Sequence, residues 1–194
     1  MNDLLQPTPL IGKKVSDISF EIFQGNKISK TSLGQYKEQW LILFFYPADF
    51  TFVCPTELED LADKYDEFKK LNTEIISVST DTAFVHKAWH DNSRAIAKVN
   101  FPMAADPGGQ LCRAFGTYIE GDGLSYRGTF IIDPDGVVRA YEMHDNNFGR
   151  SAEELLRKLQ AAQYVREHGG EACPAKWKPG DETLTPGVDL VGKI

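Results

Sequence analysis

Cysteine is scarce in this sequence, and long apolar runs are missing. The 194 residues contain three cysteines, at positions 54, 112 and 173, and no CxxC pair. Three separated thiols cannot build a disulfide scaffold or a cysteine-based zinc site. The longest apolar run covers seven residues, Trp40 to Tyr46, whereas a membrane-spanning helix needs about 20. No basic segment followed by an apolar run opens the chain, so no signal peptide is visible and we expect a cytoplasmic protein.

Basic residues are also fewer than acidic ones. The chain has 21 basic and 28 acidic residues, a net charge of −7, so we expect neither nucleic acid nor an anionic membrane as a partner. Hydrophobic residues make up 42% and charged residues 25%, as in an ordinary globular protein that buries one sizeable core. In a reducing compartment, its isolated cysteines are either inert core residues or reactive ones.

The most informative stretch runs from Leu41 to Leu71. It reads as a buried strand over 41–46, a short polar and aromatic turn, and an amphipathic helix that opens with Cys54 and Pro55. Proline favours the first helical position. The start of a helix is also the positive end of its dipole, where a thiol is stabilised as the nucleophilic thiolate.

Alternating strand and helix patterns predict an α/β fold. Period-two runs and buried apolar runs predict strands, and Asp133-Pro134-Asp135-Gly136 predicts a hairpin turn between the last two of them. Ser151, with Glu154 three residues later, predicts the start of a helix whose apolar face extends from Leu155 to Val165. The predicted strands are 18–22, 41–46, 74–80, 129–132 and 137–143, and the predicted helices are 54–71, 82–99 with a break near 91–93, a short one around 111–115, and one from 151.

A strand that leads into a helix with cysteine at its start is the layout of thioredoxin-like folds, so we expect a mixed central sheet flanked by helices. The usual second cysteine of that layout is missing, because position 57 is Glu57. A resolving thiol must therefore come from elsewhere, and Cys173 is the obvious candidate. From Glu171 onward the pattern dissolves into a tail rich in Pro, Gly and Lys. We accordingly divide the chain into a domain of residues 1–165 and an extended C-terminal arm of residues 166–194.

The run from Phe44 to Glu57, FFYPADFTFVCPTE, resembles the active-site signature of the typical two-cysteine peroxiredoxins. Similarity continues through Arg127, Gly149-Arg150 and the CPAKW segment at Cys173. The closing residues DLVGKI are similar to the tail of the bacterial alkyl hydroperoxide reductase C subunits. The resemblance covers nearly the whole chain.

This resemblance implies a thiol-dependent peroxidase that reduces hydrogen peroxide and organic hydroperoxides. Cys54 would attack the peroxide and become a sulfenic acid. Arg127 would stabilise the thiolate, Thr51 would hydrogen-bond the peroxide, and Pro47 would shield the pocket from water. Cys173 of the partner subunit would then form an intersubunit disulfide. The resemblance also implies an ion pair between Glu57 and Arg150 that holds the arginines in place.

Partners follow from the same resemblance. It suggests a homodimer, with five dimers assembling into a ring. No flavin or nicotinamide fingerprint is visible, so we expect no bound cofactor or metal, and the electrons must come from a protein. The candidates are a flavoprotein alkyl hydroperoxide reductase subunit, which the DLVGKI tail favours, and thioredoxin.

Two other functional classes stay open. One is a redox relay or holdase chaperone that uses the same cysteine switch, and the other is a metal-binding or structural module. His86 and His90 are spaced i, i+4, but no third ligand is evident, so surface or interface packing is favoured. Cys112 reads as a core residue. The loop Gly121–Gly123 lacks the Gly-Gly-Leu-Gly sequence of peroxide-sensitive relatives, which predicts an enzyme that resists over-oxidation.

Overall fold

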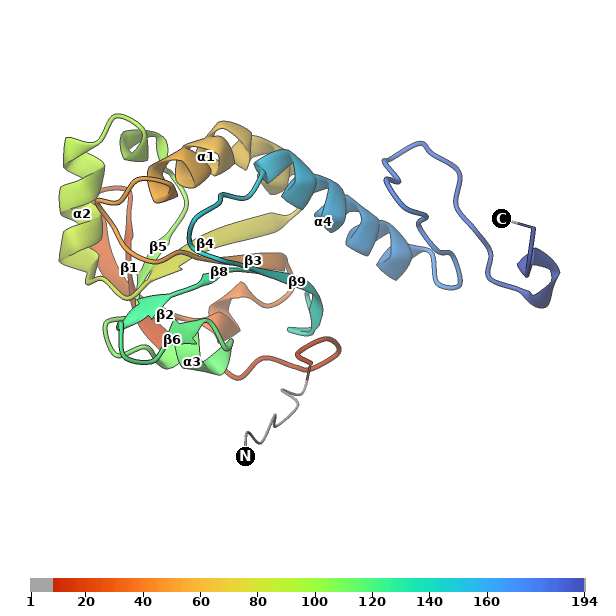
Figure 1. The fold of residues 1–194 in the computed structure, drawn as a ribbon, viewed down its shortest axis with the longest axis horizontal. Coiled ribbons are helices and arrows are strands. Elements are labelled where there is room, and N and C mark those ends of the chain that lie inside the picture. The colour runs from red at the N-terminus through yellow and green to blue at the C-terminus, as the bar shows by residue number, and fades with distance from the viewer. Residues whose placement is uncertain (1–8, 194) are drawn as a thin grey trace.

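The structure is a computed structural model, which describes residues 9–193 of the chain (Figure 1). A mixed seven-stranded sheet forms its centre, in the order β2-β1-β5-β4-β3-β8-β9. β3, β4 and β5 run parallel, while β8, β9, β1 and β2 pair antiparallel. The strands are β1 Ser19–Gln24, β2 Lys27–Ser32, β3 Trp40–Phe45, β4 Thr73–Ser79, β5 Met103–Ala105, β8 Arg127–Ile132 and β9 Val138–His144, with a separate small hairpin of β6 Tyr118–Ile119 and β7 Leu124–Ser125.

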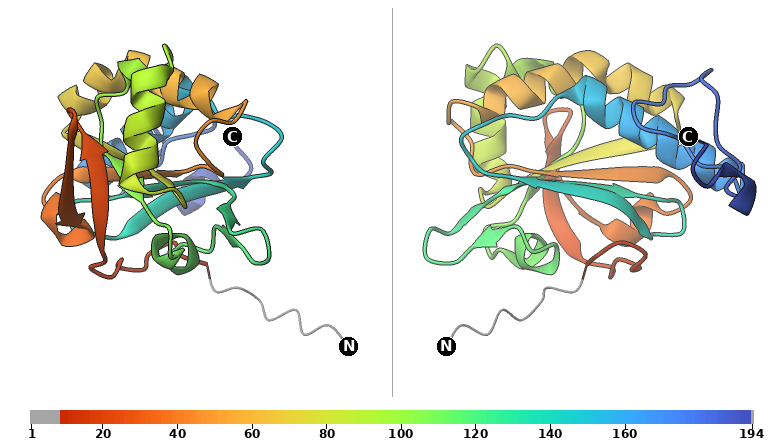
Figure 2. Two further views of the ribbon diagram at one scale, coloured as in Figure 1. Left: turned by 90° about the vertical axis from the view of Figure 1, so that its left-hand side faces the viewer. Right: turned by 45° about the vertical axis from the view of Figure 1, so that its right-hand side comes forward.

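Helices cover both faces of this sheet, as expected for the thioredoxin-like α/β class. α1, α2 and α4 lie over one face and the short α3 lies under the other (Figures 1 and 2). β3 shows why two cores form: Ile42 and Phe44 pack toward α1, whereas Leu43 and Phe45 pack toward α3. The helices are α1 Cys54–Lys70, α2 Ala83–Asn92, α3 Gln110–Ala114 and α4 Ala152–Glu167, with 3-10 turns at Leu33–Tyr36, Ile96–Lys98 and Val188–Leu190.

α1 and α4 run side by side in the same direction. The Ala152 backbone N–H donates to Asp60 Oδ2 at 2.7 Å, and eleven residues later Gln163 Nε2 donates to the Leu71 carbonyl, also at 2.7 Å. In both contacts the residue on α4 is numbered 92 higher than its partner at α1. The alignment of the two helices is therefore the same at both ends of the contact, and we call this their register. Leu155, Leu156 and Leu159 are buried in this contact.

The chain beyond α4 folds back along that helix. Gly170, with φ +95°, follows the helix end, and a small antiparallel bridge between Ala172 and Leu184 closes the segment into a loop. Trp177 anchors it: only 2% of this residue is exposed, and its ring lies 4.8 Å from that of Tyr164. This segment extends away from the sheet (Figure 1), which agrees with the expected extended arm. α4 itself continues two residues past the boundary drawn at 165.

Most predicted elements are present, including the helix break, because α2 ends at Asn92 and a 3-10 turn follows. Two strands of the main sheet, β2 and β5, were not predicted. The predicted apolar face of α4 is wrong at Val165, which is 42% exposed, because the last turn of α4 runs past the end of α1. None of the helices within residues 9–193 is both long and apolar enough to cross a membrane.

Candidate active site

Cys54 is the first residue of α1 and follows the loop that leaves β3. Its side chain is completely buried, 0% exposed. Pro55 occupies the next position of the helix, where the missing N–H costs no hydrogen bond. The sulfur therefore lies at the positive end of a 17-residue helix, screened from bulk water.

Arg127, the first residue of β8, reaches this sulfur. Its Nη1 lies 3.4 Å from Cys54 Sγ and 2.7 Å from Glu57 Oε2. Its Nε and Nη2 both donate to the Asn146 carbonyl oxygen, at 3.2 and 3.0 Å. Only 3% of the Arg127 side chain is exposed. A fixed guanidinium therefore holds a permanent positive charge beside the sulfur.

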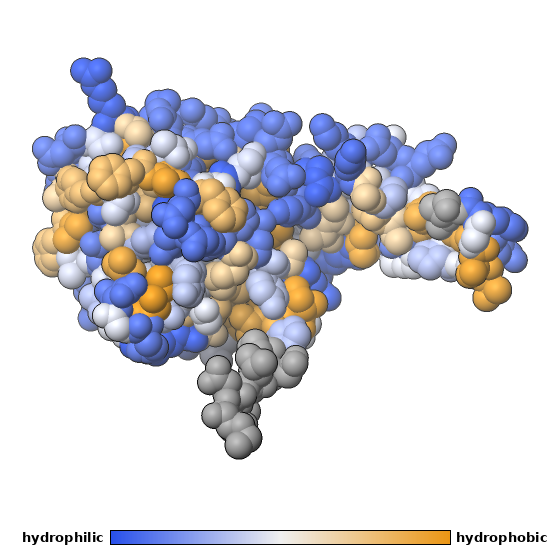
Figure 3. All heavy atoms as spheres, viewed as in Figure 1, coloured by the Kyte–Doolittle hydropathy of each residue, from blue (hydrophilic) through white to orange (hydrophobic). Residues whose placement is uncertain are grey.

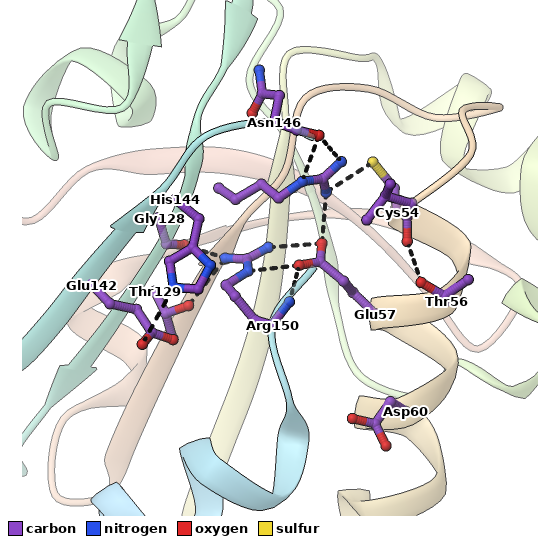
Figure 4. Close-up of polar contacts among 12 residues, drawn as sticks. Cys54, Thr56, Glu57, Asp60, Gly128, Thr129, Glu142, His144, Asn146 and Arg150 are labelled. Carbon is purple, nitrogen blue, oxygen red and sulfur yellow. Dashed lines mark hydrogen bonds and ion pairs between the residues drawn. The ribbon is translucent and has the colours of Figure 1, made fainter. Parts of the chain in front are cut away.

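Glu57 holds the arginines, as the expected ion pair implies. Its Oε1 accepts from the Arg150 backbone N–H and from Arg150 Nε, both at 2.8 Å, while Oε2 accepts from Arg150 Nη2 at 3.0 Å and from Arg127 (Figure 4). The Arg150 guanidinium also stacks on the Phe44 ring, 3.4 Å from its centroid. Burial lowers the pKa of Arg150, and the Glu57 carboxylate opposes this shift. One carboxylate thus fixes two buried cations, and one of these cations contacts the sulfur.

Pro47 and Thr51 lie in the loop between β3 and Cys54. Pro47 is buried and Thr51 is half-buried. The Thr51 hydroxyl donates to the Ala48 carbonyl at 2.9 Å, so its proton is committed to the loop while its oxygen keeps lone pairs for an incoming donor. Of the predicted site residues, Arg127 contacts Cys54 directly, and Pro47 and Thr51 lie in the loop that leads to Cys54.

A buried polar network anchors this loop. Asp49 Oδ1 accepts from the Tyr46 hydroxyl at 2.7 Å, and Asp49 Oδ2 lies 2.8 Å from His86 Nδ1. His86 Nε2 lies 3.1 Å from the Ala104 carbonyl oxygen, which can only accept, so Nε2 is the donor of this hydrogen bond. Burial raises the pKa of Asp49, and the hydrogen bond from His86 opposes this shift. The network holds a loop in which Phe50 adopts a left-handed φ of +55°.

His86 corrects one expectation. It is fully buried inside the chain, whereas the sequence favoured surface or interface packing for it. Both of its ring nitrogens already have partners, which leaves no lone pair for a metal. Within residues 9–193, no group of three or more His, Cys, Asp or Glu side chains has a geometry that could hold a metal ion.

The other two cysteines lie apart from Cys54. Cys112 is a core residue, as predicted; burial, followed by the charge of Asp106, raises the pKa of its thiol to about 12. Cys173 is half-buried on the C-terminal segment, where its sulfur lies 3.9 Å from the Ala161 carbonyl of α4. Burial raises the pKa of Cys173 as well. Within one chain, the structure does not bring Cys173 to Cys54.

Sequence reasoning missed two contributors to the site. Asn146 acts through its backbone carbonyl, so its side-chain type carries no signal. Asp49 lies five residues before Cys54, inside the stretch already identified, and the apolar surroundings of an acidic residue between Tyr46 and Phe50 were a signal that could have marked it as a buried anchor.

Two family models match the chain. The AhpC/TSA family matches residues 11–141, and the C-terminal domain of 1-Cys peroxiredoxin matches residues 161–192. The chain belongs to the AhpC/TSA family. The C-terminal match includes Cys173. The description of that family model names peroxiredoxins with one cysteine, whereas this chain carries Cys173 in the matched segment in addition to Cys54.

Individual relatives support membership of the AhpC/TSA family over almost the full length. Alkyl hydroperoxide reductase C of Salmonella typhimurium is 50% identical over 185 residues, which covers 95% of this chain and 99% of the relative. The crystal structure of Enterococcus faecalis AhpC superimposes with a TM-score of 0.83 at 47% identity, covering 85% of this chain and 99% of that one. Reduced Plasmodium vivax 2-Cys peroxiredoxin gives a TM-score of 0.86 at 29% identity, covering 90% and 92%. This AhpC/TSA protein is therefore a peroxiredoxin, an enzyme of the thiol peroxidase class.

Proposed function

We propose that the protein reduces hydrogen peroxide and organic hydroperoxides through Cys54. The Cys54 thiolate attacks one peroxide oxygen, the O–O bond breaks, and the leaving oxygen takes a proton and departs as water or alcohol. Cys54 is left as a sulfenic acid, a reversible state. The observation that carries this proposal is the Arg127 Nη1 contact to Cys54 Sγ at 3.4 Å, because it places a permanent cation where negative charge both starts and develops.

Thr51 and Pro47 complete the substrate site in this proposal. The free lone pairs of the Thr51 oxygen accept a hydrogen bond from the peroxide O–H, while Arg127 donates to the oxygens. Pro47 has no N–H and contributes a buried apolar surface that excludes water. The 0% exposure of Cys54 favours small oxidants, since a bulky electrophile cannot reach the sulfur without displacing the loop.

In the second step, Cys173 of the partner subunit resolves the sulfenic acid. The constant register of α1 and α4 supports a partner over the same chain. Ala161, which contacts Cys173, corresponds to position 69 of α1 in that register, 15 residues beyond Cys54. At 1.5 Å per residue this is about 22 Å, whereas the Cα atoms of a disulfide lie within about 7 Å of each other. Two chains in head-to-tail arrangement remove this separation.

Two surfaces suit the assembly. β9 is an edge strand of the sheet, and its outward residues Tyr141 and Met143 are 41% and 40% exposed, so a second copy can pair with this edge across a two-fold axis. Phe50, Phe52 and Phe84 are 56%, 93% and 73% exposed, and apolar side chains gather at the α2 end of the molecule (Figure 3). This end fits the contact between dimers in a ring.

The reductant is a protein in the same cytoplasmic compartment. A flavoprotein alkyl hydroperoxide reductase subunit is favoured over thioredoxin, because this chain is similar to alkyl hydroperoxide reductase C proteins over nearly their whole length. The disulfide accepts two electrons from that partner and returns both cysteines to thiols.

The assay is peroxide consumption combined with a non-reducing gel. Cys54→Ser should abolish both turnover and the disulfide-linked dimer. Cys173→Ser should keep one stoichiometric burst of peroxide reduction but lose the linked dimer, and Cys112→Ser serves as the control that keeps both. Full activity in Cys54→Ser would refute the assignment, and a linked dimer in Cys173→Ser would refute the second step.

A further inference from the structure

The last turn of α4 is fastened to the β8–β9 turn by a cluster of charged side chains. Asp133 is completely buried at its side chain, and its Oδ2 accepts from Arg139 Nε at 2.6 Å and from Arg166 Nη1 at 2.9 Å. Its Oδ1 accepts from the backbone N–H groups of Asp135 and Val137, both at 2.9 Å. Arg166 Nη2 also binds Asp135 Oδ2 at 2.8 Å. Arg166 thus bridges two carboxylates of one tight turn in a forked geometry that suits guanidinium.

Arg166 stands at the base of the segment that carries Cys173. α4 ends at Glu167, one residue later. Gly169 and Gly170 follow, both exposed, and a Cβ at either position would meet nothing within 4 Å. These two glycines form an unhindered pivot, and Cys173 lies three residues beyond it. Arg166 therefore fixes the base of the segment through which Cys173 would approach Cys54 of the partner subunit.

We propose that Arg166 is a positioning residue for the second step of the reaction, which rests on the proposed function of Cys173. In that step the partner's Cys173 sulfur attacks the Cys54 sulfenic sulfur. The S–S bond forms, the S–O bond breaks, and the hydroxide leaves with the thiol proton as water. Arg166 contacts none of these atoms. It acts through Asp133 and Asp135, which lie in a turn fixed to the sheet that also carries Arg127.

The size of the effect follows from the length of free chain. With the Arg166 contacts to Asp133 and Asp135 intact, Cys173 lies four positions beyond Gly169. Gln163 is held by the Leu71 carbonyl, so loss of the Arg166 contacts loosens at most the nine positions from Tyr164 to Cys173, and the packing of Trp177 on Tyr164 still restrains them. The effective concentration of a tethered group falls with roughly the −3/2 power of tether length. The ratio of nine to four therefore sets an upper limit of about threefold on the decrease.

Arg166→Met tests the inference, and Arg139→Gln is its matched control. Arg139 binds the same Asp133 oxygen, but it lies on β9 and not on α4. Rapid-mixing fluorescence and non-reducing gels separate Cys54 oxidation from disulfide formation, and mass spectrometry measures Cys54 sulfinic acid per turnover. We expect Arg166→Met to slow disulfide formation by up to about threefold, to raise sulfinic acid by the same factor, and to leave the first step unchanged. Arg139→Gln should leave all three quantities unchanged.

A second variant guards against misfolding. Asp135 is 64% exposed at its side chain, so Asp135→Asn weakens one of the two Arg166 contacts on the surface, and it should slow disulfide formation in the same direction by a smaller factor. A wild-type rate of disulfide formation in Arg166→Met, or equal slowing in Arg139→Gln, would overturn the inference. Cys173→Ser in the same series separates the two levels: if it still forms the disulfide, the proposed second step is wrong whatever Arg166 does.

Discussion

Replacing Glu57 by glutamine removes one charge from the buried ionic cluster beside Cys54. The carboxylate accepts four hydrogen bonds, two on each oxygen, from Arg127 and Arg150, and the three side chains are 1–3% exposed. Glutamine keeps the shape but presents an NH2 group to two of the four donors. Two charge-assisted hydrogen bonds are lost, each worth about 1.5–3 kcal/mol, and two buried guanidiniums lose their counter-charge.

We therefore expect Glu57→Gln to lower the free energy of unfolding by about 4 kcal/mol, a large fraction of a typical total of about 5–15 kcal/mol. The first step should also slow at least about tenfold, because Arg127 keeps only its Asn146 contacts and no longer sits firmly at the sulfur. Urea unfolding and rapid mixing with peroxide measure the two effects. Glu59→Gln is the control: this neighbour pairs with Lys98 at 2.7 Å but is 39% exposed, so its loss should cost less than about 1 kcal/mol. A Glu57→Gln loss as small as that of Glu59→Gln would refute the reasoning.

Three other predictions concern single side chains. Ser77 has a buried hydroxyl without a partner, so Ser77→Ala should raise the free energy of unfolding by about 1 kcal/mol. Ser79→Ala removes a 2.7 Å hydrogen bond to Asp81 and should lower it by about 1–2 kcal/mol. Urea midpoints of the two variants that move in the same direction would contradict this prediction. The pKa of Cys112, raised by burial from its usual 9.0 to about 12, means that the unfolded state loses this proton first, so stability should fall as pH rises from 9 to 12. The fall should be less steep in Cys112→Ala, which removes the contribution of this thiol. Arg127→Lys keeps the charge but loses the fork that joins sulfur, Glu57 and Asn146, so peroxide reduction should slow about 100-fold in a single-turnover assay, and an unchanged rate would rule out the geometric role.

Local pattern was enough to predict the helix that starts at Cys54 and the strand before it, because both depend on periodicity within a few residues. β5 escaped prediction for the opposite reason. Its three residues Met103–Ala105 follow a proline and include two alanines, and they form a strand only because β4 and β1 flank them. Val165 continued the apolar period of α4, yet periodicity cannot show where the neighbouring helix ends.

The residues of the site also fall into those that local sequence predicts and those that it does not. Cys54 is marked by its own neighbours in the sequence. Glu57, Arg127 and Arg150 are separated by up to 93 positions, so only the resemblance to a family linked them, and no periodicity argument could. The Asn146 contact is made by a backbone carbonyl, which every residue type possesses, so it becomes visible only when the chain is folded.

The parallel alignment of α1 and α4 has a kinetic consequence. Under the proposed second step, most of the spacing between the two thiols of one chain is helix, and a lone subunit would stop after one oxidation. The proposed cycle then has the pair of subunits as its smallest working unit, and its rate would depend on protein concentration as well as on peroxide. Below the dissociation constant of the dimer, the same protein would act as a one-shot scavenger that stores an oxidised sulfur and waits for a second copy.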